Sequence, residues 1–286
     1  RQGIKNTFRS WLGAKKGSDA SASASGASAQ GRLGGGARYP SSAIEAQLRQ
    51  VGDYAYFLCD PSTALSYYKS AASEFKGDKA WLHYASAQEM VALCLHASDA
   101  SRRDVDEAIE KANAAFDREV VQPGDFAARC ATRSALLRLT LSGDSVGGAA
   151  EKERRGGGRR VDAARMLVAQ STQESGLVAA LLLEQAARCF GAGRGGIHGE
   201  GVSPMCRQYA LHMALAGYRY AAAGQLFPAA RAFTAALGTY EGVGWRQVEE
   251  HARFALARNL AALGLHAEAT GHFLRLLEPK ERSTDL

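Results

Sequence analysis

The sequence predicts an all-α fold, a helical-repeat solenoid that follows a basic amphipathic segment and a flexible linker. From residue 39 onward, Ala, Leu, Glu, Arg and Gln dominate, and apolar residues recur three and four positions apart, which is typical of amphipathic helices. Turn signals such as Gly77-Asp78 and Pro123-Gly124 separate the helical stretches. Alternation of the β type extends over no more than about four residues anywhere in the chain.

Residues 1–16 are predicted to form a basic amphipathic helix. One side of this helix would be apolar and its flanks positively charged, and the segment contains no Asp or Glu. Helices of this kind lie in the interface of an anionic membrane. The expected membrane-binding residues are Ile4, Lys5, Phe8, Arg9, Trp11, Leu12, Lys15 and Lys16. The alternative is that the same apolar side packs against another part of the protein.

Residues 17–38 consist mainly of Ser, Ala and Gly and are expected to be a flexible linker. The α-helical solenoid is expected over residues 39–286, with Gly/Arg-rich loop insertions near 143–160 and 191–203. Caps support several helix starts, and Asp60-Pro61 is one that places an N-cap before proline. Helices are expected near residues 42–58, 62–76, 78–97, 103–119, 124–142, 161–172, 175–190, 204–223, 225–240, 246–263 and 265–278.

The expected helices pair, and the pairs resemble one another. A tetratricopeptide repeat carries alanine, an aromatic residue four positions later and a small residue three further on, in its second helix. Two good copies are Ala64/Tyr68/Ala71 and Ala229/Phe233/Ala236, and two weaker copies are Ala269/Phe273/Leu276 and Ala164/Val168/Ser171. In the first helix of a pair, Gly52 and Gly217 are the small residues that would allow close packing. The irregular spacing indicates a degenerate, tetratricopeptide-like array.

Charge and cysteine content give no reason to expect nucleic acid or disulfide bonds. The net charge of +6 resides in residues 1–38, which hold seven basic residues and one acid, so the remaining 28 basic and 28 acidic residues cancel. The run Arg154–Arg160 resembles an RNA-binding RGG tract, but it lacks interleaved aromatic residues and is better explained as a solvated loop. The five cysteines include no CxxC and are expected to be buried, reduced thiols.

Motifs for catalysis or cofactor binding are weak. Gly191–Gly196 matches GxGxxG, yet it follows a helical stretch rather than the β-strand that a dinucleotide site requires. The sequence contains no HExxH metal motif. We therefore expect no enzyme activity, no cofactor and no small-molecule substrate.

Several longer segments resemble the family of the TRAPP III-specific subunit, which includes the 85-kDa yeast subunit and its animal counterpart, the eighth subunit. The N-terminal matches are residues 1–8, Trp11-Leu12-Gly13 and Tyr39-Pro40. The matches in the helical region are residues 64–68, 81–90, 180–190, 207–220 and 242–245. Together they span nearly the whole chain apart from its Gly/Ser/Arg-rich insertions.

The resemblance implies a scaffold that recruits TRAPP III to membranes and supports nucleotide exchange on a Rab1-type GTPase in secretory traffic and autophagy. The implied partners are other TRAPP subunits, an anionic membrane surface and, indirectly through the complex, the GTPase. The implied location is cytoplasmic, at the periphery of Golgi, ER-derived vesicle or autophagosomal membranes. The alternative function is a generic tetratricopeptide-type protein-binding adaptor without a membrane role.

Overall fold

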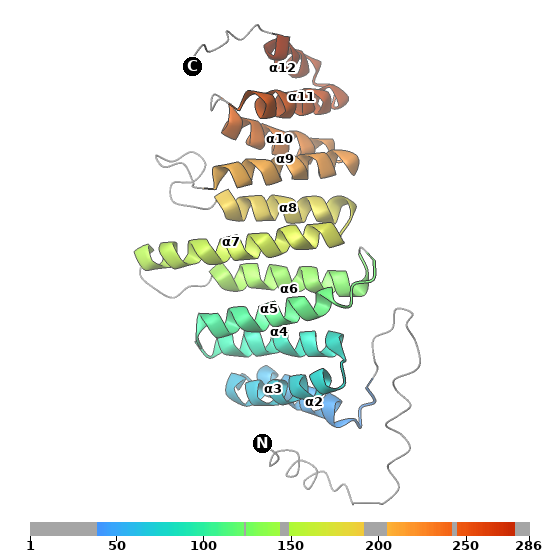
Figure 1. Cartoon of the computed structure of the whole chain (residues 1–286), viewed down its shortest axis with the longest axis vertical. Coiled ribbons are helices and arrows are strands. Elements are labelled where there is room, and N and C mark those ends of the chain that lie inside the picture. The colour runs from blue at the N-terminus through green and yellow to red at the C-terminus, as the bar shows by residue number, and fades with distance from the viewer. Residues whose placement is uncertain (1–38, 123, 144–148, 192–204, 242–244, 278–286) are drawn as a thin grey trace, which may run out of the picture.

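The computed structural model describes residues 39–122, 124–143, 149–191, 205–241 and 245–277, and all regular structure in these ranges is α-helical (Figure 1). The helices are α2 (Ile44–Phe57), α3 (Pro61–Gly77), α4 (Trp81–Ala97), α5 (Arg102–Asp117), α6 (Phe126–Gly143), α7 (Ala149–Gln173), α8 (Gly176–Gly191), α9 (Cys206–Ala222), α10 (Leu226–Tyr240), α11 (Arg246–Ala262) and α12 (His266–Leu277). Each packs on the helices before and after it in the chain, so the stack grows in one direction from α2 to α12. The predicted all-α solenoid is confirmed.

The helices form two rows, one of even-numbered and one of odd-numbered helices. Polar contacts between helices two apart in the chain demonstrate this arrangement. In the even-numbered row, Arg231 of α10 reaches Glu184 of α8 at 2.8 Å. In the odd-numbered row, Gln170 of α7 donates to Asp117 of α5 at 2.9 Å, and the Tyr218 hydroxyl of α9 lies 2.6 Å from His251 of α11. Because helices in one row are side by side, each row presents a continuous surface of its own.

The repeat residues predicted from the sequence lie at the helix contacts. Ala64, Tyr68 and Ala71 of α3 are fully buried, and Gly52 of α2 approaches the ring of Tyr68. In the same way, Gly217 of α9 approaches the ring of Phe233 of α10. The repeat residues Ala229, Phe233 and Ala236 of α10 are also fully buried. The weaker copy in α12 is only partly buried, since Ala269 is buried while Phe273 and Leu276 are half-buried. Small residues at these contacts let neighbouring helix axes come close together.

Local caps act as the sequence predicts at the start of α3. The Asp60 carboxylate accepts a hydrogen bond of 3.1 Å from the backbone N–H of Thr63, and Pro61 is the first helical residue. Hydrogen bonds from Thr63 and Ser62 lower the pKa of Asp60 to about 2.

The residue before this cap, Cys59, has a positive φ of 61° and is exposed, so the expectation that it would be buried is wrong. Cys59 lies in the turn between α2 and α3, where none of the residues that the structure describes covers its side chain.

The two expected insertions need correction. Helix α7 begins at Ala149, so most of the 143–160 segment, including the Arg154–Arg160 run, is helical rather than a loop. Gly156-Gly157-Gly158 disfavours a helix by roughly 1 kcal/mol per glycine, but good helix formers flank it and the C-terminal half of α7 packs on α6 and α8. Gly191 is the buried last residue of α8, not the first residue of a loop. Residues 144–148 and 192–204 lie outside the described residues.

Candidate interaction surfaces

The predicted membrane-binding residues, which lie between Ile4 and Lys16, fall outside the described residues, as does the predicted linker. Membrane contact by this segment therefore stays a prediction. Among the helices that the structure describes, none combines the length and the apolar character needed to cross a bilayer.

Helix α8 carries a buried carboxylate that holds three helices together. Glu184, at 3% exposure, accepts hydrogen bonds from the Tyr220 hydroxyl of α9 at 2.6 Å and from Arg231 of α10 at 2.8 Å. Arg188, one turn along α8, adds a third at 2.7 Å. Burial and the hydrogen bond to Glu184 raise the pKa of Tyr220 to about 12. A buried carboxylate is tolerated because its oxygens are paired in this way.

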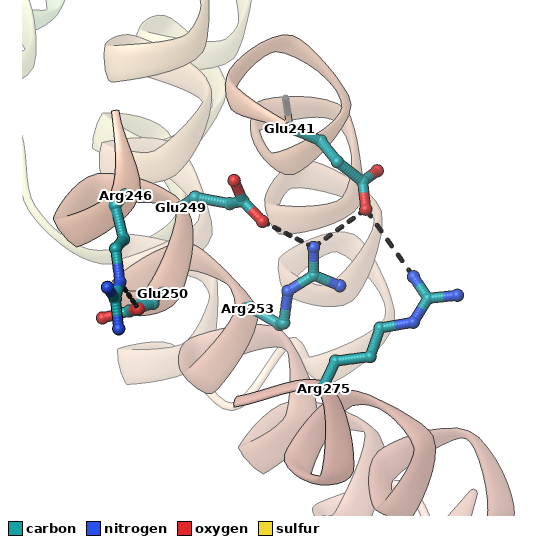
Figure 2. A network of polar contacts seen from close by, with 6 residues as sticks. All are labelled: Glu241, Arg246, Glu249, Glu250, Arg253 and Arg275. Carbon is teal, nitrogen blue, oxygen red and sulfur yellow. Dashed lines mark hydrogen bonds and ion pairs between the residues drawn. The ribbon is translucent and has the colours of Figure 1, made fainter. Parts of the chain in front are cut away.

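A second buried network joins α10, α11 and α12 (Figure 2). Arg253 of α11 is 3% exposed and donates to Glu241 at 2.8 Å and to Glu249 at 2.9 Å. Arg275 of α12 approaches Glu241 at 3.6 Å. Burial alone would lower the pKa of Arg253, but its hydrogen bonds to the two glutamates raise it. The buried part of the network therefore joins Arg253 to Glu249 and Glu241, whereas α12 is linked to it only by the exposed pair of Arg275 and Glu241, which adds little stability.

A third buried carboxylate lies in the N-terminal half. Glu89 of α4 is 6% exposed and pairs with Arg133 of α6, the next helix in the same row. Burial raises the pKa of Glu89, and the hydrogen bond and charge of Arg133 only partly oppose this effect. Glu89 and Glu184 are thus held in the same way. Each is a buried carboxylate on an even-numbered helix and pairs with an arginine two helices later.

These networks have the character of structural pairing rather than catalysis. Their carboxylates are paired with arginine side chains, and Glu184 also with the Tyr220 hydroxyl. Within the described part of the chain, no three His, Cys, Asp or Glu side chains gather closely enough to hold a metal ion. All five cysteines are free thiols.

An exposed apolar surface lies on the odd-numbered row at its C-terminal end. Leu211, Leu215 and Tyr218 of α9 are 50%, 42% and 39% exposed, and Phe254 of α11 is 47% exposed. In the earlier helices of this row, exposed positions are mostly polar, as with Lys69 in α3, or are small. No pattern in the sequence predicted that this surface would be exposed. The i, i+4, i+7 spacing within α9 indicated a leucine-tyrosine stripe, but only the packing shows that this side of α9 is exposed.

The chain matches known proteins over most of its length. Residues 1–142 match the family model described as the ER-Golgi trafficking TRAPP I complex 85 kDa subunit. Trafficking protein particle complex subunit 8 from Homo sapiens is 32% identical over 247 residues, which cover 85% of this chain. The chain spans only 15% of the length of that human relative. The extent of this identity, together with the helical solenoid, shows that the chain belongs to the family of the 85-kDa TRAPP subunit and subunit 8.

Proposed function

We propose that this chain is a non-catalytic scaffold and membrane-recruitment part of a TRAPP III complex. In this function it supports nucleotide exchange on a Rab1-type GTPase during ER–Golgi traffic and autophagy. The observation that carries the proposal is the 32% identity to subunit 8 over 85% of the chain. The proposed location is the cytoplasmic side of Golgi, ER-derived vesicle or autophagosomal membranes, with peripheral attachment.

The proposed direct partners are other TRAPP subunits. A solenoid suits this task because its stacked helices expose long surfaces, and each part of the surface can contact a different protein. The buried pairs around Glu184 and Arg253 fix neighbouring helices relative to one another, which keeps such surfaces in register. The exchange reaction is assigned to other subunits of the complex, so the GTPase would be reached only through them.

The proposed membrane contact rests on the composition of residues 1–16. Partial insertion of the Phe8 and Trp11 rings contributes a few kcal/mol, since complete burial of a large apolar side chain contributes about 1.5–3 kcal/mol. Each basic residue adds about 1 kcal/mol at an anionic surface. The cost of ordering the segment, about 1–2 kcal/mol per residue before its helical hydrogen bonds form, opposes these gains. Binding should therefore be weak and reversible, and a second contact within the assembled complex would strengthen it.

Liposome flotation of the assembled complex tests the membrane part. Phe8→Asp with Trp11→Asp should abolish flotation with anionic vesicles and leave assembly with the other subunits unchanged. Asn6→Asp with Ser10→Asp is the matched control, because it adds the same charge on the opposite side of the predicted helix. Equal flotation of the Phe8/Trp11 variant and the unchanged protein would refute the membrane contact. Failure of that variant to assemble would instead identify its apolar side as a packing surface.

Co-purification with defined subunits tests the scaffold part. The chain should retain TRAPP subunits in stoichiometric amounts when all are co-expressed, and it should do so without membranes. The alternative, a generic adaptor without a membrane role, predicts no stable TRAPP assembly and no flotation.

A further inference from the structure

The α9–α11 face consists of three residues from each helix. They are Leu211, Leu215 and Tyr218 of α9 and His251, Phe254 and Arg258 of α11. Within each helix the three residues recur at spacings of three and four, so they lie on one side. The two helices run parallel, because the Arg207 guanidinium lies 4.6 Å from the Trp245 ring near their starts and Tyr218 meets His251 further along.

The exposed charge of this face is positive. Helix α9 contains no Asp or Glu. The two acids of α11 are already engaged, since Glu249 is buried against Arg253 and Glu250 pairs with Arg246 at 2.7 Å. The exposed Arg219 and Arg258 form no ion pair with any carboxylate in the described ranges. The surroundings of the apolar side chains therefore favour a negatively charged partner.

The limited exposure of the apolar side chains on this face favours binding of a helix over insertion into a bilayer. Its apolar side chains are about half exposed, from 39% for Tyr218 to 50% for Leu211, whereas Phe57 and Leu277 elsewhere protrude at 86% and 78%. The Tyr218 ring is held from below by Phe233 at a centroid distance of 4.9 Å. Shallow apolar surface between two parallel helices accepts the ridge of a third helix, while insertion among lipids needs protruding side chains.

We propose that the α9–α11 face binds an amphipathic helix of another polypeptide, with large aliphatic residues on one side and Asp or Glu along its flanks. The apolar side of that helix would lie over Leu211, Leu215 and Phe254. Its carboxylates would pair with Arg219 and Arg258 at the rim. This contact is independent of residues 1–16, so it can be right where the membrane proposal is wrong.

Site-specific photo-cross-linking tests the identity of the occupant. The photoreactive p-benzoylphenylalanine replaces the exposed Gln247, one turn before His251 on α11, and the full chain is irradiated in cells. Mass spectrometry should find a cross-linked segment of a different protein with helical apolar spacing and flanking acids. Cross-linking to lipid alone, to a second copy of this chain, or to a segment without this pattern would overturn the proposal.

Paired variants show whether the contact uses the face itself. Leu211→Glu with Leu215→Glu should reduce that cross-link at least about tenfold, as expected for central apolar anchors. Leu181→Glu in α8 is the control, because Leu181 is 47% exposed but belongs to the other row. Thermal unfolding verifies that both variants remain folded. If the double variant unfolds, the single surface change Arg258→Glu replaces it in the test and should also weaken the cross-link. An undiminished cross-link in the folded variants would contradict the proposal.

Two designed helical peptides test the charge preference. Both carry leucine at helical spacing, and they differ only in glutamate or lysine along the flanks. The unchanged chain should bind the glutamate peptide about tenfold more tightly at low salt, and Arg219→Glu with Arg258→Glu should reverse this order. Equal affinity for the two peptides would refute the assignment of an acidic partner.

Discussion

Gly217 of α9 lies directly against the ring of Phe233 of α10. A β-carbon at Gly217 would be 2.9 Å from both Cε1 and Cζ of that ring, closer than real side chains allow. Gly52 with Tyr68 and Gly191 with Tyr209 repeat the relationship at the same distance. Each pair joins consecutive helices, so the missing side chain sets how closely these helices pack.

Gly217→Ala should destabilise the fold by about 1–3 kcal/mol from overpacking, less the gain of up to about 1 kcal/mol from better helix propensity. Phe233 is fully buried and has little room to move. Chemical denaturation measures the effect. Gly238→Ala in α10 is the control, because a β-carbon there would meet nothing within 4 Å. That change should stabilise the protein or leave it unchanged, and equal effects of the two substitutions would contradict the packing explanation.

Tyr220→Phe should destabilise the protein by about 1–3 kcal/mol, because it removes a hydrogen bond to the buried Glu184 carboxylate. Tyr218→Phe, on the same helix, removes an exposed hydrogen bond and should cost less than about 1 kcal/mol. A double-mutant cycle with Glu184→Gln isolates the coupling between the two groups. No measurable coupling would show that Glu184 is held by its arginines alone.

Acidification should loosen α12 through His272. Burial and the nearby charges of Arg253 and Arg275 lower the pKa of His272 from 6.5, although Glu241 and Glu268 oppose them. Because the unfolded chain takes up the proton first, the contribution of neutral His272 is complete above pH 6.5 and is lost as the pH falls below it. His272→Gln should flatten the pH dependence of hydrogen exchange in α12 over this window. The exposed His266→Gln should not, and identical profiles for both would exclude His272 as the cause.

Gly157→Ala should slow hydrogen exchange in the first half of α7. The residue lies inside a helix, where replacing glycine by alanine is worth up to about 1 kcal/mol. Local exchange rates of residues 149–158 are the measurement, because global unfolding is dominated by packed helices. Unchanged rates would indicate that these residues are not helical in solution.

The sequence alone determined the fold class and most of its elements. Helical spacing predicted the all-α solenoid, and the Ala64/Tyr68 and Ala229/Phe233 motifs, together with Gly52 and Gly217, identified two close helix contacts. Both signals are local, since propensity and periodicity act over a few turns. Locality also explains the error at Gly156-Gly157-Gly158, where propensity favours a loop but α7 continues as a helix.

Only the tertiary structure decided which residues far apart in the chain meet. Gly191 with Tyr209, Glu184 with Arg231, and the α9–α11 face depend on how the helices stack, which no local pattern encodes. Leu211 and Leu215 have the spacing of core residues, and their exposure follows from the absence of a helix over that side of α9 among the described residues. Burial is a property of the assembled stack, because the side of a helix that becomes buried is fixed only when its neighbours are in place.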